Sequence, residues 1–321
     1  MEVTTSAESS IHHLVLDFLR VSQSAALAAY PWIGKSNKTM ADDAGTMAMR
    51  KQLNLINMSG TIVIGEGEMD DAPMLHIGEK IGTGNGPLID IAVDPIEGTS
   101  LLSTGQDNSL AVIAVAAGGS LLHAPDMYMT KLAVGPKAKD CINIDISLTE
   151  NMKIVAEKLG KEVSELTVMV QDRPRHHRLM KEVMALNATI KLFSDVDITG
   201  AIGTAIDESG VDLFVGTGGA PEGVIAATAL KCLGGDFQAK LVPQNSAEIE
   251  RCKRMGINDL DRKFTINDII KTNDCFFIAT GITDGMLLKG VQKKNNGSKL
   301  THSLVVTGKN HVYQFIEAHH K

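Results

Sequence analysis

Short apolar runs alternate along this chain with segments whose apolar residues have helical spacing, and this alternation limits the folds open to it. Runs that are rich in Val and Ile and have the length of buried strands predict strands. They lie at 61–64, 90–93, 110–117, 131–134, 142–146, 167–171, 189–194, 211–216, 237–242, 275–281 and 303–308. Helices are expected near the start of the chain, where Thr5 and Glu8 suit a capping box, and at 42–57, 151–160, 177–187 and 221–233.

The order of these elements predicts an α/β protein in which helices cover sheets. The alternation is most regular after residue 150, so we expect an α+β arrangement in the N-terminal half and an α/β arrangement in the C-terminal half. We place a domain boundary near residue 165. It would separate a metal-binding domain, 1–165, from an α/β domain, 166–321, that completes the site.

Composition argues against several classes of function. The 321 residues carry 31 Lys and Arg against 38 Asp and Glu, a net charge of −7, with only 8 Phe, 3 Tyr and 1 Trp, which disfavours a nucleic-acid partner. The longest apolar run, at 110–117, is too short to cross a membrane. The sequence begins without an export signal, and its four cysteines form no C-x-x-C pair. We therefore expect a cytoplasmic protein with reduced thiols.

Carboxylates recur where apolar strands end. Glu66 lies in GEGEMDD after the strand at 61–64, and Asp94 and Glu97 lie in DPIEGT after the next strand. Glu222 follows the glycine-rich segment that ends a later strand. Loops at such strand ends converge on one crevice in α/β proteins. Oxygen ligands without His or Cys favour Mg²⁺ or Mn²⁺ over Zn²⁺, so the pattern predicts a site for a hard divalent cation.

Taken singly, each of these carboxylates has a simpler explanation. The acidic turn around Glu66 is typical of a solvated loop, and Glu222 suits the first turn of a helix. Asp94 with Pro95 stops a strand, and Asp42 suits a helix N-cap. These explanations must hold independently, whereas one metal site accounts for the whole set.

The segment DPIEGT is the most specific of these elements. It places an Asp and a Glu three residues apart and then opens a helix with Gly-Thr, which adds a hydroxyl and free backbone N–H groups. The N–H groups and the helix dipole suit a phosphate oxygen that bound metal ions would share. This layout predicts hydrolysis of a phosphate ester.

Together with GTIVIGEGEMDDAPM, NSLAV, APDMYM, RPRH and GGAPEG, this segment resembles the class II fructose-1,6-bisphosphatases of bacteria. These belong to the lithium-sensitive, metal-dependent phosphatases. The resemblance runs from RVSQSAALAAYPWIGKSNK to ATGITDGMLLKGV, almost the whole chain. It implies a layered αβαβα fold, Mn²⁺ or Mg²⁺ as cofactor, and a homodimer or homotetramer. The implied reaction is hydrolysis of the 1-phosphate of fructose 1,6-bisphosphate by metal-activated water, a step of gluconeogenesis.

The resemblance also implies roles for individual residues. The implied metal ligands are Asp42 and Glu66 for one ion, and Asp94, Glu97 and Glu222 for a second. In catalysis, Asp70 would accept a proton, Thr99 would orient water or phosphate, and Lys38 would neutralise phosphate charge. The implied substrate contacts are Glu97, Gly98, Thr99, Tyr128, Arg173, Pro174, Arg175, Asp195, Val196, Asp197 and Gly219.

Two positions depart from the family pattern. Val196 stands where the family usually has glycine, and a β-branched residue does not readily take the positive φ that glycine allows. Asp43 beside Asp42 leaves the ligand choice open, and we prefer Asp42 because it keeps the spacing to Arg50.

Other functions stay open at this point. Sedoheptulose 1,7-bisphosphate or an inositol phosphate would use the same chemistry, and a non-catalytic phosphosugar-binding regulator would keep the fold. A calcium site of the EF-hand type fails because its loop motif is absent from the sequence. We expect the histidines at 176, 177, 319 and 320 to lie at the surface without a metal role.

Overall fold

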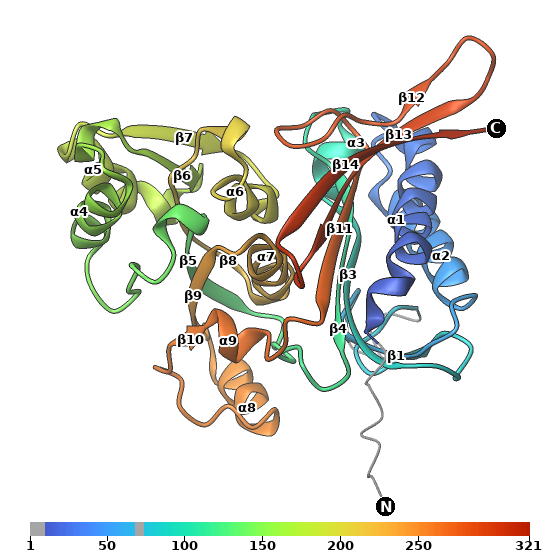
Figure 1. Ribbon diagram of the computed structural model, residues 1–321, viewed down its shortest axis with the longest axis horizontal. Helices are drawn as coiled ribbons and strands as arrows, with labels where there is room; N and C mark the ends of the chain where they lie inside the picture. The colour runs from blue at the N-terminus through green and yellow to red at the C-terminus, as the bar shows by residue number, and fades with distance from the viewer. Residues whose placement is uncertain (1–9, 68–73) are drawn as a thin grey trace, which may run out of the picture.

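The computed structural model describes residues 10–67 and 74–321, and their elements form five layers (Figure 1). Helices α1 and α2 cover the outer face of an eight-stranded sheet, and α6 and α7 lie between this sheet and a six-stranded one. Helices α4 and α5 cover the outer face of the second sheet. The αβαβα layering and the mixed α/β class are thereby confirmed.

Helices and strands are numbered separately along the chain. The helices are α1 (Val15–Ala29), α2 (Lys38–Leu53), α3 (Thr99–Ser103), α4 (Leu148–Leu159), α5 (His177–Ala185), α6 (Asp197–Gly203), α7 (Ala220–Leu233), α8 (Ser246–Arg254) and α9 (Ile266–Ile269). The strands are β1 (Ser59–Ile64), β2 (Lys80–Ile81), β3 (Leu88–Glu97), β4 (Leu110–Ala117), β5 (Tyr128–Val134), β6 (Thr167–Gln171), β7 (Thr189–Phe193), β8 (Leu213–Gly219), β9 (Asp236–Leu241), β10 (Phe264–Thr265), β11 (Cys275–Gly281), β12 (Gln292–Lys293), β13 (Lys299–Thr307) and β14 (Val312–His320). The first sheet has the order β12-β13-β11-β4-β3-β1-β2 with β14 beside β13, and the second has the order β10-β9-β5-β8-β6-β7.

Successive side chains of the central strands point to opposite faces of the sheets and contribute to three hydrophobic cores between the layers. On β4, Ala111, Ile113 and Val115 belong to the core under α1 and α2, whereas Leu110, Val112 and Ala114 belong to the core that contains α7. A third core joins the second sheet to α4 and α5. Both faces of these strands are buried, which explains why they are continuous apolar runs in the sequence.

Most predicted elements are confirmed, and the strands expected at 110–117 and 275–281 have those bounds. The helix expected at 42–57 instead runs from Lys38 to Leu53, because the Asn37 side chain accepts a hydrogen bond from the Met40 N–H at 3.1 Å and caps it. Asp42 lies inside this helix, so the N-cap interpretation of Asp42 is wrong. The capping box of Thr5 and Glu8 lies outside the described residues.

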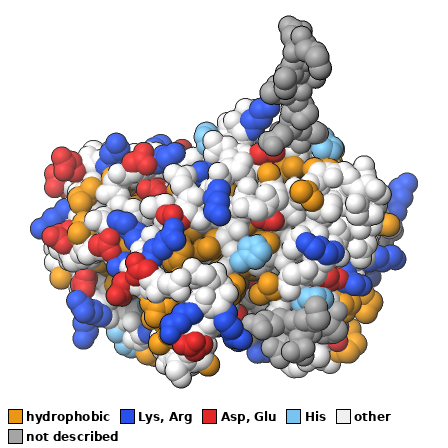
Figure 2. Space-filling model, turned by 90° about the horizontal axis from the view of Figure 1, so that it is seen from below, with side chains coloured by type: hydrophobic (Ala, Val, Ile, Leu, Met, Phe, Trp, Pro, Cys, Tyr) orange, Lys and Arg blue, Asp and Glu red, His pale blue; other side chains and the backbone are white. Residues whose placement is uncertain are grey.

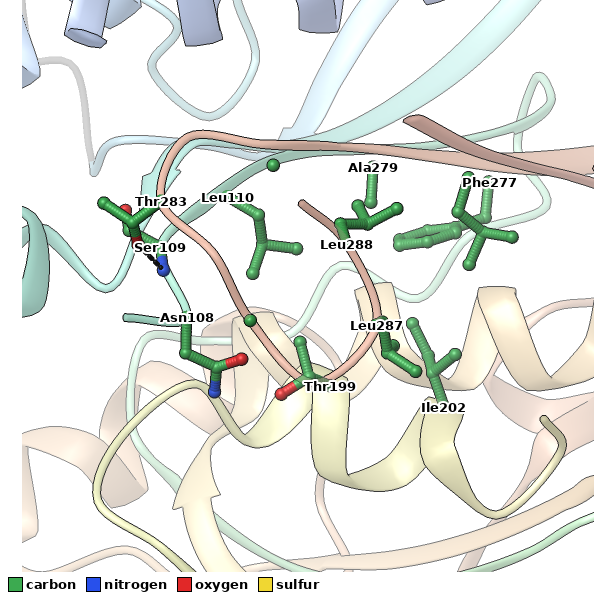
Figure 3. Close-up of a pocket in the computed structure, with 13 residues that line it drawn as sticks. Asn108, Ser109, Leu110, Thr199, Ile202, Phe277, Ala279, Thr283, Leu287 and Leu288 are labelled. Carbon is green, nitrogen blue, oxygen red and sulfur yellow. Dashed lines mark hydrogen bonds between the residues drawn. The ribbon is translucent and has the colours of Figure 1, made fainter. Parts of the chain in front are cut away.

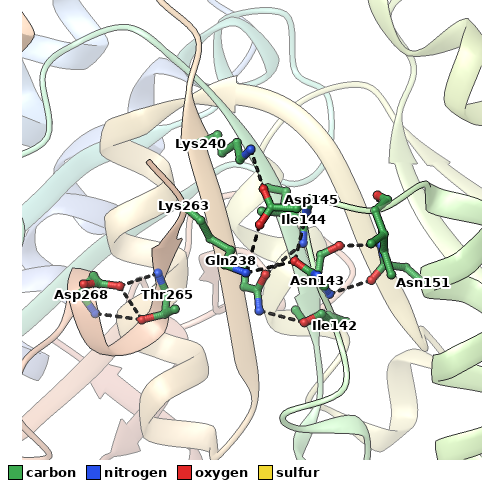
Figure 4. Close-up of polar contacts among 11 residues, drawn as sticks. Ile142, Asn143, Ile144, Asp145, Asn151, Gln238, Lys240, Lys263, Thr265 and Asp268 are labelled. Carbon is green, nitrogen blue, oxygen red and sulfur yellow. Dashed lines mark hydrogen bonds and ion pairs between the residues drawn. The ribbon is translucent and has the colours of Figure 1, made fainter. Parts of the chain in front are cut away.

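The strand expected at 142–146 is wrong, and Figure 4 shows the reason. Its backbone groups are taken by side chains: the Ile144 N–H donates to Gln238 Oε1 at 2.9 Å, and the Asn143 N–H donates to Asn151 Oδ1 at 2.8 Å. Asp145 is held between Lys240 at 2.6 Å and Lys263 at 3.1 Å. These bonds replace a strand ladder with a fixed loop.

Among the described residues, seven helices and strands were not predicted from the sequence: α6, α8, α9, β2, β10, β12 and β14. Alternation does not reveal β14 because most of its side chains are exposed. The domain boundary near residue 165 stays a prediction, and each sheet takes strands from both sides of it. None of the cysteines forms a disulfide, and Cys232, Cys252 and Cys275 are buried.

The surface carries charges of both signs. On the face in Figure 2, acidic and basic side chains are interspersed over the described part of the molecule. Of the helices in residues 10–67 and 74–321, none is long and apolar enough to cross a membrane.

Candidate active site

Carboxylates from distant parts of the chain line one open cleft of about 380 Å³. Its acidic lining residues are Asp42, Glu66, Asp94, Glu97, Asp126, Asp195 and Glu222. Strands β1 and β3 are parallel neighbours, so Glu66 and the end of β3 meet at one edge of the first sheet. The volume suits a small phosphorylated ligand.

A bulge in β3 directs both of its carboxylates into the cleft. The strand continues to Glu97, so the expectation that it stops at Asp94 and Pro95 is wrong. Asp94 pairs with Val112 but Glu97 pairs with Leu110, which adds one residue to β3 relative to β4. The extra residue places Asp94 and Glu97 on the same side of the sheet, although simple alternation would separate residues three apart.

The Gly98–Thr99 turn that follows is tightly built. Gly98 has φ 81°, a conformation that favours glycine, and α3 begins at the next residue. The Thr99 hydroxyl lies 2.9 Å from both Asp42 Oδ1 and the Ile96 carbonyl. Lys38 Nζ donates to Ser100 Oγ at 2.8 Å, which holds its positive charge beside α3. Four predicted site residues thus meet at one turn.

Partial loss of hydration dominates the electrostatics of the acidic groups: Glu97 is buried, Asp42, Asp94 and Glu222 are half-buried, and Glu66 is exposed. This loss of hydration raises the pKa of Glu66 to about 8, with further increases from Asp94 and Asp42, and raises the pKa of Glu222 to about 7. The pKa values of Asp94 and Glu97 also rise through loss of hydration, that of Glu97 well above its ordinary value. Carboxylates this crowded require a cation to stay ionised together.

The side chains present fit a hard cation. Glu222 Oε2 is buried and accepts no hydrogen bond from the described residues, and such a carboxylate oxygen is suited to binding a metal ion. Gly219 makes room for it, since a Cβ there would lie 1.9 Å from that oxygen. Among the described residues, no three Asp, Glu, His or Cys side chains already converge as a complete metal site. The assignment of individual ligands therefore stays a prediction.

The residues predicted to contact the sugar phosphate gather beside the cleft, mostly with protein partners. Tyr128 pairs with Gly219 across β5 and β8, and the Arg175 guanidinium lies 5.1 Å from the Tyr128 ring centre. Arg175 Nε donates to the Thr217 carbonyl at 2.8 Å, and Arg173 lies 4.0 Å from Asp195. Pro174 opens the short 3₁₀ turn that carries Arg175. Asp195 lines the cleft, whereas Tyr128, Arg173, Arg175 and Asp197 lie outside its lining.

Val196 adopts the conformation that its side chain disfavours. Its φ is 72° and its side chain is 1% exposed. A Cβ at Gly98 would lie 2.8 Å from Val196 Cγ2, so the two segments approach closely. The backbone between Asp195 and Asp197 therefore has the conformation that glycine allows. Val196 adopts it although it is β-branched, at a cost of about 1–3 kcal/mol.

Three residues near the site were not predicted from the sequence. Asp126 lines the cleft, and Lys131 is a buried lysine that bonds Asp197 at 2.6 Å. His176 is not a surface residue: it is 1% exposed, lies 2.8 Å from the Gln171 carbonyl and accepts from the Thr217 N–H at 2.8 Å. The sequence offered one signal that Lys131 is buried, namely its place in the apolar run of β5. Asp70 lies outside the described residues.

A second hollow does not compete with the cleft. It lies between the first sheet and α6, where Leu110, Phe277 and Leu288 face Ile202 (Figure 3). Its volume is about 10 Å³, room for one water molecule at most. It cannot admit a sugar phosphate.

An open cleft lined by carboxylates beside a Gly-Thr helix start is the kind of site that metal-dependent phosphatases use. The model of the family described as bacterial fructose-1,6-bisphosphatase, glpX-encoded, matches residues 12–320. The chain belongs to this family. It is therefore a hydrolase of the phosphatase class, and the class is metal-dependent.

Curated relatives agree along nearly the whole chain. The fructose-1,6-bisphosphatase class 2 of Haemophilus influenzae is 43% identical over 320 residues, 96% of this chain and 96% of that protein. The fructose-1,6-bisphosphatase 1 class 2 of Escherichia coli K12 is 44% identical over 320 residues, 96% of this chain and 95% of that protein. Among solved structures, the extragenic suppressor protein SuhB of Bartonella henselae aligns with 60% of this chain and 72% of that chain at a TM-score of 0.34 and 12% identity.

Proposed function

We propose that this chain hydrolyses the 1-phosphate of fructose 1,6-bisphosphate, releasing fructose 6-phosphate and phosphate as a step of gluconeogenesis. Membership of the family supports the substrate. The observation that carries the chemistry is the carboxylate-lined cleft beside the Gly98–Thr99 turn, in which a Glu222 oxygen has no hydrogen-bond partner among the described residues.

Asp42 and Glu66 would hold one divalent cation, and Asp94, Glu97 and Glu222 a second. Bound Mn²⁺ or Mg²⁺ would lower the pKa of water and neutralise charge on the phosphoryl oxygens. The cleft supplies oxygen ligands only, which suits either cation.

The turn after β3 would orient the reacting phosphate. The free N–H groups after Gly98 can donate to its oxygens, and the Thr99 hydroxyl can orient the phosphate or the attacking water. Lys38 adds a positive charge at the rim, held by Ser100. Asp70 would accept the proton that the water loses.

The second phosphate and the sugar would occupy the neighbouring end. Arg173 and Arg175 can grip a phosphate through forked donors, and Asp195 and Asp197 can accept hydrogen bonds from sugar hydroxyls. Two arginines at the position of a second phosphate favour a bisphosphate over a monophosphate.

Phosphate release with added Mn²⁺ or Mg²⁺ tests this proposal, beside an EDTA control. Fructose 1,6-bisphosphate is compared with sedoheptulose 1,7-bisphosphate and an inositol phosphate. We expect metal-dependent release that is fastest from fructose 1,6-bisphosphate. No release from any ester, by a folded protein that still binds metal, would favour a non-catalytic regulator.

Sedoheptulose 1,7-bisphosphate is the second candidate substrate because of Val196. The buried side chain of Val196 stands between Asp195 and Asp197 and fixes their backbone. If this alters sugar selectivity, release from the seven-carbon ester would be faster. The chemistry at the acidic cleft would be unchanged.

We also propose a homo-oligomer that forms through the edge strand β14. Val312, Tyr313 and Phe315 are 48%, 37% and 42% exposed, and the strand contains no Lys, Pro or Gly to discourage pairing. Antiparallel pairing of two copies about Gln314 would set Tyr313 of each copy opposite Phe315 of the other. Light scattering should give a multiple of 34.3 kDa. Phe315→Lys should give a monomer, while Leu88→Lys at another exposed apolar position should not.

The four free thiols suit a reducing compartment, which supports the cytoplasm as the site of action. Fractionation of cells that make the full chain tests this.

A further inference from the structure

Lys131 is a buried lysine in a layer otherwise filled with apolar side chains. It lies at the middle of β5 and is 1% exposed. Its neighbours on the same face of the strand, Met129 and Ala133, belong to the central core between the two sheets. A charged side chain is retained in such a place only when a partner offsets the loss of hydration.

The partner of Lys131 is Asp197, the first residue of α6. Lys131 Nζ donates to Asp197 Oδ2 at 2.6 Å, the distance of a strong charge-assisted hydrogen bond. Asp197 is 9% exposed, so little water screens the pair. In the described part of the chain, no hydrogen bond engages the other carboxylate oxygen, Oδ1.

Two glycines shape the space around this pair. A Cβ at Gly218 would lie 2.2 Å from Asp197 Oδ2 and 3.3 Å from Lys131 Nζ. A Cβ at Gly223, in the first turn of α7, would lie 3.3 Å from Lys131 Cε. Glycine at both positions therefore leaves room for one arrangement of the two side chains.

We propose that Lys131 is a positioning residue for sugar recognition: it holds Asp197 by Oδ2 and leaves Oδ1 to accept a hydrogen bond from a sugar hydroxyl. This inference rests on the proposed function, in which Asp197 contacts the sugar. The strained Val196 precedes Asp197 directly, so the backbone and the side chain of this segment are both fixed before substrate arrives. Preorganisation of this kind lowers the free-energy cost of binding.

A double-mutant cycle between Lys131 and Asp197 tests the proposal. Lys131→Met keeps the length of the side chain and removes its charge, and Asp197→Asn removes the charge of the partner. With saturating Mn²⁺, KM and kcat for fructose 1,6-bisphosphate are measured for both variants and their combination. The inhibition constant of inorganic phosphate, which has no sugar, reports on the reacting end alone.

We expect Lys131→Met to raise KM about tenfold, the loss of one good hydrogen bond, while the phosphate inhibition constant stays the same. In the Asp197→Asn background, Lys131→Met should change KM by less than about twofold, because the group it positions is already altered. The combined variant should melt at a higher temperature than Lys131→Met alone, since no uncompensated carboxylate stays buried.

The matched control is Lys161 with Asp212, an ion pair of the same 2.6 Å length between the turn after α4 and the residue before β8. Lys161→Met should leave KM unchanged. If Lys131→Met lowers the melting temperature without moving KM, or moves KM equally in both backgrounds, the proposal is wrong. If the single variant does not fold, Lys131→Gln, which keeps a donor, takes its place in the cycle. Absence of metal-dependent release by the unmodified enzyme would instead overturn the proposed function.

Discussion

The two ends of the candidate site are built in opposite ways. At the acidic end, carboxylates on β3 and α7 are crowded together, and Glu222 Oε2 has no hydrogen-bond partner among the described residues. At the sugar end, the charged side chains already have protein partners: Asp197 has Lys131, and Arg175 has Gln171 and the Thr217 carbonyl. In the proposed function a cation would complete the first end, whereas the second is organised by the protein itself. Changes at the first should therefore affect turnover, and changes at the second should affect substrate affinity.

Asp94→Asn should break the acidic end most completely. Loss of one carboxylate that holds a cation removes several kcal/mol of transition-state stabilisation, so kcat should fall about a thousandfold or more. The fold should stay intact, as circular dichroism would show. The control is Asp43→Asn: Asp43 is exposed on α2 while its neighbour Asp42 lines the cleft. Normal activity of Asp94→Asn would remove this residue from the metal site. Loss of activity in Asp43→Asn would mean that Asp43, and not Asp42, is the metal ligand.

Arg175→Ala should show the opposite pattern at the sugar end. Removal of the guanidinium takes away a charge-assisted contact to the second phosphate, so KM should rise about tenfold or more while kcat changes little. Arg178→Ala is the matched control, because the Arg178 side chain is 90% exposed on α5 and pairs only with Glu182 among its described neighbours. Steady-state kinetics decide the matter: an unchanged KM for Arg175→Ala would exclude it from the pocket.

The crowding of carboxylates should also appear in the pH dependence of stability without metal. The pKa of Glu66 rises from 4.5 to about 8, and that of Glu222 from 4.5 to about 7. Between about pH 5 and 7 the folded chain keeps protons that the unfolded chain has released. The free energy of unfolding should therefore fall as pH rises. Glu222 contributes at most about 1.4 kcal/mol per pH unit, and Glu66 contributes less because its side chain is exposed and solvent screens it.

Thermal unfolding in EDTA, compared between the unmodified chain and Glu66→Gln, isolates this contribution from other titrating groups. As pH rises from 5 to 8, the unmodified chain should lose stability relative to Glu66→Gln. Mn²⁺ should restore more stability at pH 8 than at pH 5, since protons compete with it. A difference that does not vary with pH would mean that the pKa of Glu66 is not raised in the folded chain.

The sequence predicted the acidic end better than the sugar end for a physical reason. A continuous apolar run is a strong signal for a strand, and Asp94 and Glu97 directly follow one, so the strand and its carboxylates were predicted together. The bulge that turns Asp94 and Glu97 to one side depends on the register against β4, which no local pattern encodes. In the same way, residues 142–146 have the composition of a strand. They form a loop because their backbone N–H groups bond to the side chains of Asn151, in the next helix, and Gln238, which is distant in sequence.

At the sugar end, the residue types came from the resemblance and the partners came from the fold. Lys131 pairs with a residue 66 positions away, so the ion pair is invisible before β5 and α6 are placed. His176 looked like a surface charge because RPRHH is polar, yet its ring bridges the Gln171 carbonyl and the Thr217 N–H. Its burial is a consequence of where β6 and β8 lie.

The smallest predicted effect concerns Val196, where the fixed backbone of the sugar end is maintained against strain. Val196→Ala and Val196→Gly differ only in the Cβ atom of alanine, and glycine adopts φ 72° with less strain than alanine. Val215, buried on β8, gives the matched comparison at an ordinary strand position. Chemical denaturation should show the Gly variant more stable than the Ala variant by about 1 kcal/mol at 196, and less stable by about the same amount at 215. The same sign at both positions would mean that residue 196 is unstrained. The sugar end would then owe its fixed geometry to the ion pair of Asp197 alone.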